Sequence, residues 1–150
     1  MKLVLALAAA ATLVGASYTP DQDAALKTVK DFVAAFNAGD TLAIKNTCAA
    51  ETVIIDEFAP HEWHGANACM RWVNDWSADA EKNKITDAVV TLDKPWHVDV
   101  TGNVAYIVAP ANYTFKTKGK TVKERGSVIA ISLAKGDAGW KMTGWSWAKH

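Results

Sequence analysis

The apolar residues that follow Pro20 recur three or four positions apart, as on the buried face of an amphipathic helix. The segment Thr19-Pro20-Asp21-Gln22 has the form of a capping box with proline in the first turn, so this helix is expected to begin there. Gly39 is expected to end it, and Asp40 to cap a short second helix over about 42–49. The apolar positions of the first helix are Leu26, Val29, Phe32, Val33 and Phe36.

A β-branched strand follows, and helical spacing then returns. Thr52-Val53-Ile54-Ile55 is expected to open a strand that runs to Phe58, with a loop over 60–65 after it. A third amphipathic helix is predicted by the apolar positions beyond this loop. These positions are Cys69, Val73, Trp76 and Ala80, with Trp72 beside them.

From Ile85 onward the apolar period changes to two, the spacing of strands that bury one face. Turns that contain glycine, at 101–103, 118–120 and 136–139, separate long strands, which is typical of an antiparallel meander. Three helices followed by such a meander predict an α+β domain in which the three N-terminal helices pack on one face of a curved antiparallel sheet.

The alternation within the predicted strands indicates which side chains face the helices. Between 103 and 116 the odd positions, including Tyr113 and Phe115, are apolar or aromatic. Between 121 and 134 the odd positions 129, 131 and 133 are apolar, and the same face then includes Arg125 and Ser127 near one end.

The last strand alternates between large and small side chains. Strict alternation puts Trp140 and Met142 on the same face as the small residues at 144, 146 and 148. It puts Trp145 and Trp147 on the opposite face. Small side chains beneath the helices leave space, so we expect a cavity between the helices and the sheet.

The first 16 residues have the pattern of a secretory signal peptide. Lys2 precedes an apolar stretch, and small residues allow cleavage after Ala16 or, as second choice, after Ser17. The stretch is shorter than the roughly 20 apolar residues of a membrane-spanning helix. We therefore expect an exported protein, periplasmic or secreted, with a single domain over 17–150 and no membrane attachment after cleavage.

Export would place Cys48 and Cys69 in an oxidising compartment, where two thiols can pair. Both lie on apolar faces of predicted helices, so the sequence leaves open a disulfide or two buried thiols. The chain has 16 Lys+Arg against 16 Asp+Glu, and this balance argues against nucleic acid as a partner.

The segment KDFVAAFNAGDTLAIKNTCAAETVIIDEFAPHEWHG resembles the opening of the nuclear transport factor two-like superfamily, in its SnoaL-like and ketosteroid-isomerase-like branch. The resemblance is carried by the helix stop AAFNAGD, the short second helix, the strand ending in Asp56, and Gly65 before the third helix. It implies a cone-shaped α+β barrel with a pocket at its open end. Such domains often form dimers through the outer face of the sheet.

Asp56 is the first candidate catalytic residue. Its predicted strand face also holds Ile54 and Phe58, and burial among apolar neighbours would raise its pKa toward that of a general acid or base. In ketosteroid isomerases the matching position carries the aspartate that moves the proton. The alternative is a structural aspartate, paired with Arg125 or accepting hydrogen bonds from loop N–H groups.

The sequence departs from ketosteroid isomerases at their oxyanion hole. Those enzymes use a tyrosine hydroxyl and a protonated aspartate, where this chain has Phe32 and Ser127. Without these donors that isomerase activity is not expected. Arg125, with Tyr113 as a second donor, would instead suit an acidic or carbonyl-bearing ligand.

His64 is a further candidate, as a general base or a lid residue at the pocket rim, against an exposed loop histidine. Its neighbour Trp63, together with Phe32, Trp76, Tyr113, Phe115 and Ser127, is expected to line the pocket. His61 and His64 do not have the spacing of the zinc-binding HExxH helix, since position 65 is glycine. We expect no metal and no cofactor.

Trp145 and Trp147, on the outer sheet face by this alternation, predict a homodimer interface or, alternatively, cover by the chain around Trp96. The leading hypothesis for function is an exported domain that binds a small apolar molecule. The alternative is a proton-transfer enzyme of the isomerase, cyclase or dehydratase type that uses Asp56, with Arg125 or His64. A third option is a dimerisation scaffold with a filled cavity.

Overall fold

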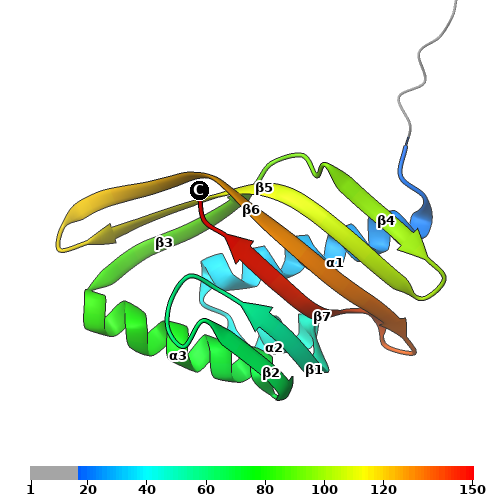
Figure 1. Ribbon diagram of the computed structural model, residues 1–150, viewed down its shortest axis with the longest axis horizontal. Helices are drawn as coiled ribbons and strands as arrows, with labels where there is room; N and C mark the ends of the chain where they lie inside the picture. Colours follow the sequence, from blue (N-terminus) through cyan, green and yellow to red (C-terminus); the bar gives the residue numbers. More distant parts are fainter. Residues whose placement is uncertain (1–16) are drawn as a thin grey trace, which may run out of the picture.

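The computed structural model describes residues 17–150, so the signal peptide predicted for 1–16 lies outside the described residues. Three helices pack on one curved, unclosed sheet (Figure 1), as the sequence predicted for the α+β class. The helices are α1 (Pro20–Ala38), α2 (Thr41–Thr47) and α3 (Ala68–Asn83). No helix within 17–150 has the length and apolar character needed to span a membrane.

The first helix begins and ends as its sequence predicts. The Thr19 hydroxyl accepts a hydrogen bond from the Gln22 N–H, and the Gln22 side-chain oxygen Oε1 accepts one from the Thr19 N–H, which completes the capping box. Gly39 ends the helix with φ of +68°, a conformation that favours glycine. Asp40 then caps α2 through a 2.9 Å hydrogen bond from the Ala43 N–H.

The chain between α2 and α3 differs from the sequence prediction. Strand β1 (Cys48–Ile55) begins earlier than expected and ends before Asp56. The segment predicted as a loop contains strand β2 (Glu62–Ala66), which pairs antiparallel with β1. The local sequence gives little sign of this strand, because its stability comes from hydrogen bonding to β1 and from the buried indole of Trp63.

The remaining strands form the meander that the period of two predicted. They are β3 (Ile85–Leu92), β4 (His97–Thr101), β5 (Val104–Thr117), β6 (Lys120–Gly136) and β7 (Gly139–Ala148). The sheet order is β2-β1-β7-β6-β5-β3, and β4 pairs with β5. Strand β1 runs parallel to β7, so the sheet is mixed rather than purely antiparallel.

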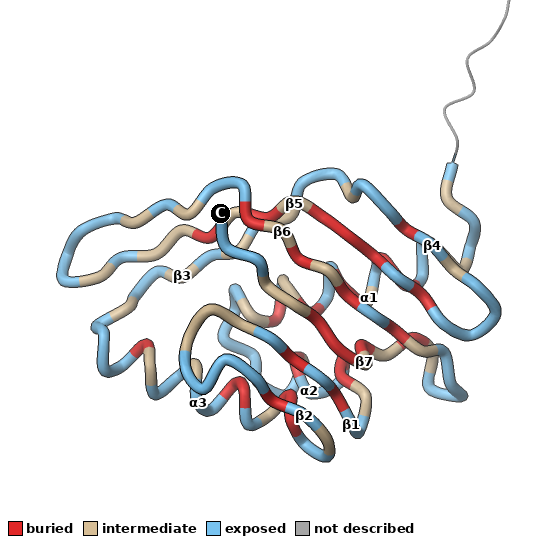
Figure 2. The backbone as a smooth tube through the Cα atoms, in the orientation of Figure 1, coloured by how far each residue is buried: buried red, intermediate tan, exposed pale blue. Residues whose placement is uncertain are grey.

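The core lies between α1 and the sheet, where the tube in Figure 2 shows buried stretches along β5, β6 and β7. Val29 of α1, Ile54 of β1, Ile107 of β5 and Met142 of β7 are completely buried. Helix α3 packs against β1 and β2 and closes the same face of the sheet farther along. Burial of these apolar side chains is the main force that holds the layers together.

Two β-bulges reverse the alternation on which the inward-facing residues were predicted. In β6, Ala111 pairs with Ser127 but Tyr113 pairs with Glu124, so Arg125 and Gly126 together oppose one residue of β5. Gly126 has φ of +77°, which the bulge requires and glycine supplies. Beyond the bulge Glu124 faces inward, and Arg125 is exposed. The prediction that Arg125 faces the helices is wrong.

A second bulge changes the faces of β7. Ser132 pairs with Gly144 and Leu133 with Met142, which leaves Thr143 without a partner in the ladder. Trp140 and Met142 are buried, and beyond the extra residue Trp145 and Trp147 face the helices as well. Their predicted place on the outer face is therefore wrong, and they do not carry the homodimer that was inferred from them.

A disulfide joins Cys48, at the start of β1, to Cys69, in the first turn of α3. The two Cα atoms are 6.4 Å apart and the two residues are separated by 21 positions. Of the two states that the sequence left open, the structure has the disulfide. It fixes the first turn of α3 against the strand that leads to Asp56.

Replacement of both cysteines, Cys48→Ala with Cys69→Ala, is expected to lower the free energy of unfolding by about 3 kcal/mol. The bridge joins residues that are 21 positions apart. Its loss gives the unfolded chain more conformational entropy. Urea denaturation measures the change. Dithiothreitol should weaken the wild type by a similar amount and leave the double variant unchanged. Equal stability of the two proteins in oxidising buffer would contradict a stabilising bridge.

Candidate functional site

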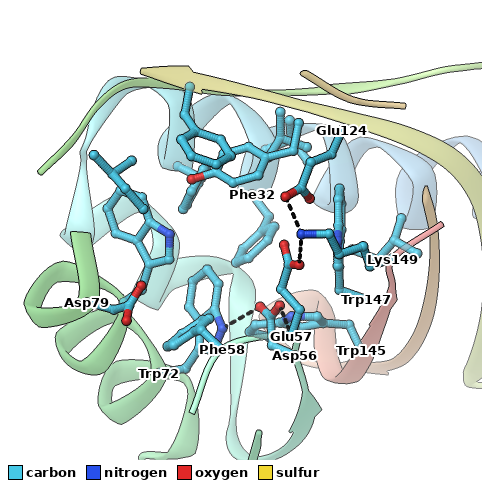
Figure 3. A pocket seen from close by; sticks show the side chains of 18 residues that line it. Phe32, Asp56, Glu57, Phe58, Trp72, Asp79, Glu124, Trp145, Trp147 and Lys149 are labelled. Carbon is cyan, nitrogen blue, oxygen red and sulfur yellow. Dashed lines mark hydrogen bonds and ion pairs between the residues drawn. The ribbon is translucent and has the colours of Figure 1, made fainter. Parts of the chain in front are cut away.

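A pocket of about 250 Å³ lies between the C-terminal half of α1, helix α3 and one end of the sheet. Half of the residues that line it are aromatic (Figure 3). The helices contribute Phe32, Phe36, Trp72 and Trp76, and the strands β5 and β7 contribute Tyr113, Phe115, Trp145 and Trp147. The pocket therefore has the apolar, concave form of a small-molecule site.

Trp72 is the centre of the aromatic wall. Its ring lies 6.0 Å from Phe32, 5.9 Å from Phe36 and 5.2 Å from Trp145, centroid to centroid. The contact with Trp145 is edge-to-face, at an interplanar angle of 88°. This geometry is favourable for aromatic rings and fixes the indole in one orientation.

The same indole positions Asp56. Trp72 Nε1 donates a hydrogen bond of 2.8 Å to Asp56 Oδ2, and the Glu57 N–H donates one of 2.7 Å to Oδ1. Asp56 stands directly after β1, where its own N–H donates to the carbonyl of His61 and begins the turn toward β2. Its carboxylate thus lines the pocket with one fixed donor on each oxygen.

Burial raises the pKa of Asp56 above its ordinary value of 3.8. The hydrogen bonds from Trp72 and the Glu57 N–H oppose this rise because they stabilise the charged form, and the nearby charge of Glu124 adds to it. The carboxyl therefore holds its proton more tightly than an exposed aspartate. A group of this kind can take up and return a proton near a bound molecule.

A second acidic pair lies beside Asp56. Lys149 Nζ is 2.7 Å from Glu57 Oε2 and 2.5 Å from Glu124 Oε1, and so bridges two carboxylates from distant parts of the chain (Figure 3). Burial raises the pKa of Glu57; Lys149 opposes the rise and Glu124 adds to it. The two carboxylates in turn raise the pKa of Lys149, so its ammonium stays charged.

Three buried polar atoms of the residues that line the pocket have no hydrogen-bond partner within the described chain. They are Oε2 of Glu124, whose side chain is only 9% exposed, the hydroxyl of Tyr113, and Nε1 of Trp147. Burial raises the pKa of Tyr113 to about 12, so the hydroxyl keeps its proton and can act as a donor. Unpartnered buried polar groups are costly and usually mark a site that is completed by something else.

Five of the residues predicted from the sequence meet in this pocket. Asp56, Phe32, Trp76, Tyr113 and Phe115 all line it. The strand ending at Asp56 and the helical stripe around Trp76 were the features that allowed this prediction. Their chemical roles remain predictions.

Four other predicted residues lie elsewhere. Arg125 is exposed on the outer side of the β6 bulge, and His64 is exposed on β2. Trp63 is buried behind the pocket wall, where its Nε1 donates to Asp75 Oδ2 at 2.7 Å. Ser127 is fully buried, and it does not line the pocket. The site therefore lacks the guanidinium that the sequence prediction placed beside Asp56.

The sequence prediction missed Glu57, Glu124 and Lys149. Strand alternation put Glu57 opposite Asp56, but the chain leaves the strand at this point and turns both side chains toward the pocket. The one available signal for Glu124 was Gly126, since a glycine within a strand often marks a bulge. Nothing in the local sequence indicates Lys149. Within residues 17–150, no three His, Cys, Asp or Glu residues are grouped to hold a metal ion.

The raised pKa of Asp56 predicts how its contribution to stability changes with pH. The folded state favours the protonated carboxyl, so this contribution is present below the ordinary pKa of 3.8 and is lost as pH rises through the folded pKa. As pH rises from below 3.8 through the raised pKa of Asp56, the free energy of unfolding of the wild type should therefore fall relative to that of Asp56→Asn. Urea denaturation at a series of pH values measures the difference.

The matched control for this titration is Asp99→Asn, which removes an exposed carboxylate on β4. It should show little of the same pH dependence. The opposite result would be a wild type that gains unfolding free energy relative to Asp56→Asn as pH rises. That result would show that the surroundings stabilise the charged carboxylate and do not destabilise it.

Solved structures with the same fold come from several classes of protein. A nuclear transport factor 2-like superfamily protein from Salmonella enterica serovar Typhimurium is 14% identical, with a TM-score of 0.72 over 85% of this chain and 89% of its own. A ketosteroid isomerase-like protein from Erwinia carotovora atroseptica is 14% identical, with a TM-score of 0.69 over 88% of this chain and 98% of its own. A CaMKII hub from S. rosetta is 18% identical, with a TM-score of 0.70 over 90% of this chain and 100% of its own.

These identities establish the shared fold alone. No protein of curated function has a sequence that matches this chain. The SnoaL-like domain family matches residues 26–146, which include all the residues that line the pocket except Trp147 and Lys149. This agrees with the resemblance that the AAFNAGD segment and the strand ending in Asp56 implied. The chain belongs to the SnoaL-like domain family.

Proposed function

We propose that this chain is an exported protein that binds a small molecule with a largely apolar body in the aromatic pocket. The observation that carries the proposal is the pocket itself. It measures about 250 Å³, has aromatic walls, and includes three buried polar atoms, Glu124 Oε2, the Tyr113 hydroxyl and Trp147 Nε1, that have no partner within the described residues. A scaffold with a merely filled cavity would not require these groups. Export is supported by the signal-like pattern of 1–16 and by the Cys48–Cys69 disulfide, since stable disulfides are typical of oxidising compartments.

Proton-transfer catalysis is the second candidate, and Asp56 is the observation that favours it. Members of this superfamily include proteins assigned as isomerases and dehydratases. Asp56 has a raised pKa inside the pocket, as a general acid or base needs. The first-helix position of the ketosteroid isomerase oxyanion hole is Phe32, which has no donor, and Ser127 does not reach the pocket. Binding is therefore favoured over that particular chemistry.

Obstruction of the pocket tests the proposed function directly. Val90 lines the pocket, whereas the next residue along β3, Val89, is exposed. Val90→Trp is expected to fill the space and abolish binding of a neutral apolar probe, naphthylmethanol. Val89→Trp adds the same side chain outside the pocket and should leave binding unchanged. Isothermal titration calorimetry measures both.

Native mass spectrometry of protein purified from its own host complements this titration. A copurified small molecule that is present in the wild type and absent from Val90→Trp would identify the ligand. The two candidate functions then separate at Asp56→Asn: loss of turnover with retained binding indicates an enzyme. An empty wild type that also fails to bind the probe would contradict the proposed function.

We also propose a homodimer, formed through exposed residues other than Trp145 and Trp147. Val53, Ile55 and Tyr106 are at least half exposed on the outer face of the sheet. Val53 and Tyr106 line a shallow groove that also includes Gly144. Analytical ultracentrifugation is expected to find a dimer that Tyr106→Glu converts to a monomer. Leu42→Glu, at an exposed apolar residue on α2, should leave the dimer intact. A monomeric wild type would contradict the interface.

A further inference from the structure

The charges that line the pocket are strongly unequal. Four acidic side chains, Asp56, Glu57, Asp79 and Glu124, are present, and among the described residues that line the pocket Lys149 is the one with a basic side chain. Arg125, which would have changed this balance, is held outside by the β6 bulge. The chain as a whole has as many basic as acidic residues, so the excess of carboxylates is a property of this site.

Glu124 leaves one carboxylate oxygen of this acidic group without a hydrogen-bond partner among the described residues. Its side chain is nine-tenths buried, and one of its oxygens, Oε1, is paired with Lys149. The other, Oε2, has no hydrogen-bond partner in the described chain. The close-up places the Glu124 carboxylate at the pocket, facing Lys149 and Glu57 (Figure 3). A buried carboxylate oxygen of this kind favours an incoming hydrogen-bond donor, and a charged donor most of all.

Lys149 shows which kind of donor this part of the pocket accepts. Its primary ammonium lies between Glu57 and Glu124 and forms an ion pair with one carboxylate oxygen of each. Lys149 is the penultimate residue and its side chain is about half exposed. Among the described residues, it pairs with Oε1 of Glu124 and leaves Oε2 without a hydrogen-bond partner.

The aromatic walls favour the same sign of charge. The faces of tryptophan, tyrosine and phenylalanine rings are electron-rich and attract cations. Trp145 and Trp147 on β7 and Tyr113 on β5 come from the strands on either side of the Glu124 position. A ligand carboxylate would meet like charge from several side chains, with Lys149 already shared by two of them.

We infer that the molecule bound in this pocket is an organic amine, with an apolar body between the aromatic walls and a protonated amino group that donates to Glu124 Oε2. The inference rests on the proposed binding function and names the chemical class of its ligand. It replaces the acidic or carbonyl-bearing ligand that followed from a pocket containing Arg125. Lys149 and the ligand ammonium would together balance the charge of two of the four carboxylates.

Three probes with one shared ring system test the sign of the charge. Naphthylmethylamine, naphthylmethanol and naphthoate are cationic, neutral and anionic near pH 7, and isothermal titration calorimetry compares their affinities for the full chain. The amine is expected to bind about tenfold to a hundredfold more tightly than the alcohol, the gain typical of a hydrogen bond to a charged group. Naphthoate should bind more weakly than the alcohol.

Glu124→Gln keeps the shape of the side chain and removes its charge. This variant should lose most of the preference for the amine and keep its affinity for the alcohol. Glu81→Gln makes the same change on the exposed surface of α3 and should behave as the wild type. Circular dichroism checks that both variants are folded. If Glu124→Gln does not fold, the comparison of the three probes on the wild type still tests the inferred ligand class.

The outcomes distinguish a wrong ligand class from the absence of a binding site. If the alcohol or naphthoate binds as tightly as the amine, the inferred ligand class is wrong while the pocket remains a binding site. If the amine is preferred but Glu124→Gln retains the preference, Glu124 is not its partner and the inference is overturned. If none of the three probes binds, the proposed function and the inferred amine fail together.

Discussion

The hydrogen bond from Trp72 to Asp56 joins the parts of the molecule on which the pocket depends. Trp72 belongs to α3, Asp56 follows β1, and the same indole packs edge-to-face on Trp145 of β7. Helix, strand end and sheet are therefore fixed relative to one another by a single side chain. Because the indole N–H can donate and its ring is apolar, it stabilises a carboxylate without admitting water to the wall.

Desolvation sets the electrostatics of this pocket. Asp56 and Glu57 both have a raised pKa, and in both the main cause is burial. Lys149 offsets part of this cost at Glu57 and Glu124, but one ammonium cannot serve every carboxylate oxygen that faces the cavity. Buried charge that the fold leaves incompletely paired is unfavourable for stability, and it is retained most readily where it binds or reacts with something.

The two bulges decide which chemistry enters the pocket. Without the bulge at Gly126, strict alternation would present Arg125 to the helices and Glu124 to the solvent. Without the unpaired Thr143, the two tryptophans of β7 would lie on the outer face. Each bulge adds one residue to a strand, and one residue is enough to exchange the two faces for everything beyond it. A single position of register thus decides whether β6 presents an anionic or a cationic side chain to the pocket.

Local sequence patterns were sufficient to predict the helices, the meander and the place of Asp56. The capping box at Thr19, the stop at Gly39 and the apolar period of each segment are determined by near neighbours in the chain, so they can be recognised without coordinates. The resemblance carried by the strand ending in Asp56 also gave the family.

Contacts between distant segments decided the rest. Strand β2 forms because β1 is available to pair with it, and the Cys48–Cys69 bridge needed a Cα separation that no spacing reveals. Glu57, Glu124 and Lys149 meet only after the chain has turned at Asp56, bulged at Gly126 and returned along β7. The sequence by itself determined the elements and one pocket acid. Tertiary structure decided whether Glu124 or Arg125 faces the pocket, because this depends on strand register, and register is set by pairing across the sheet.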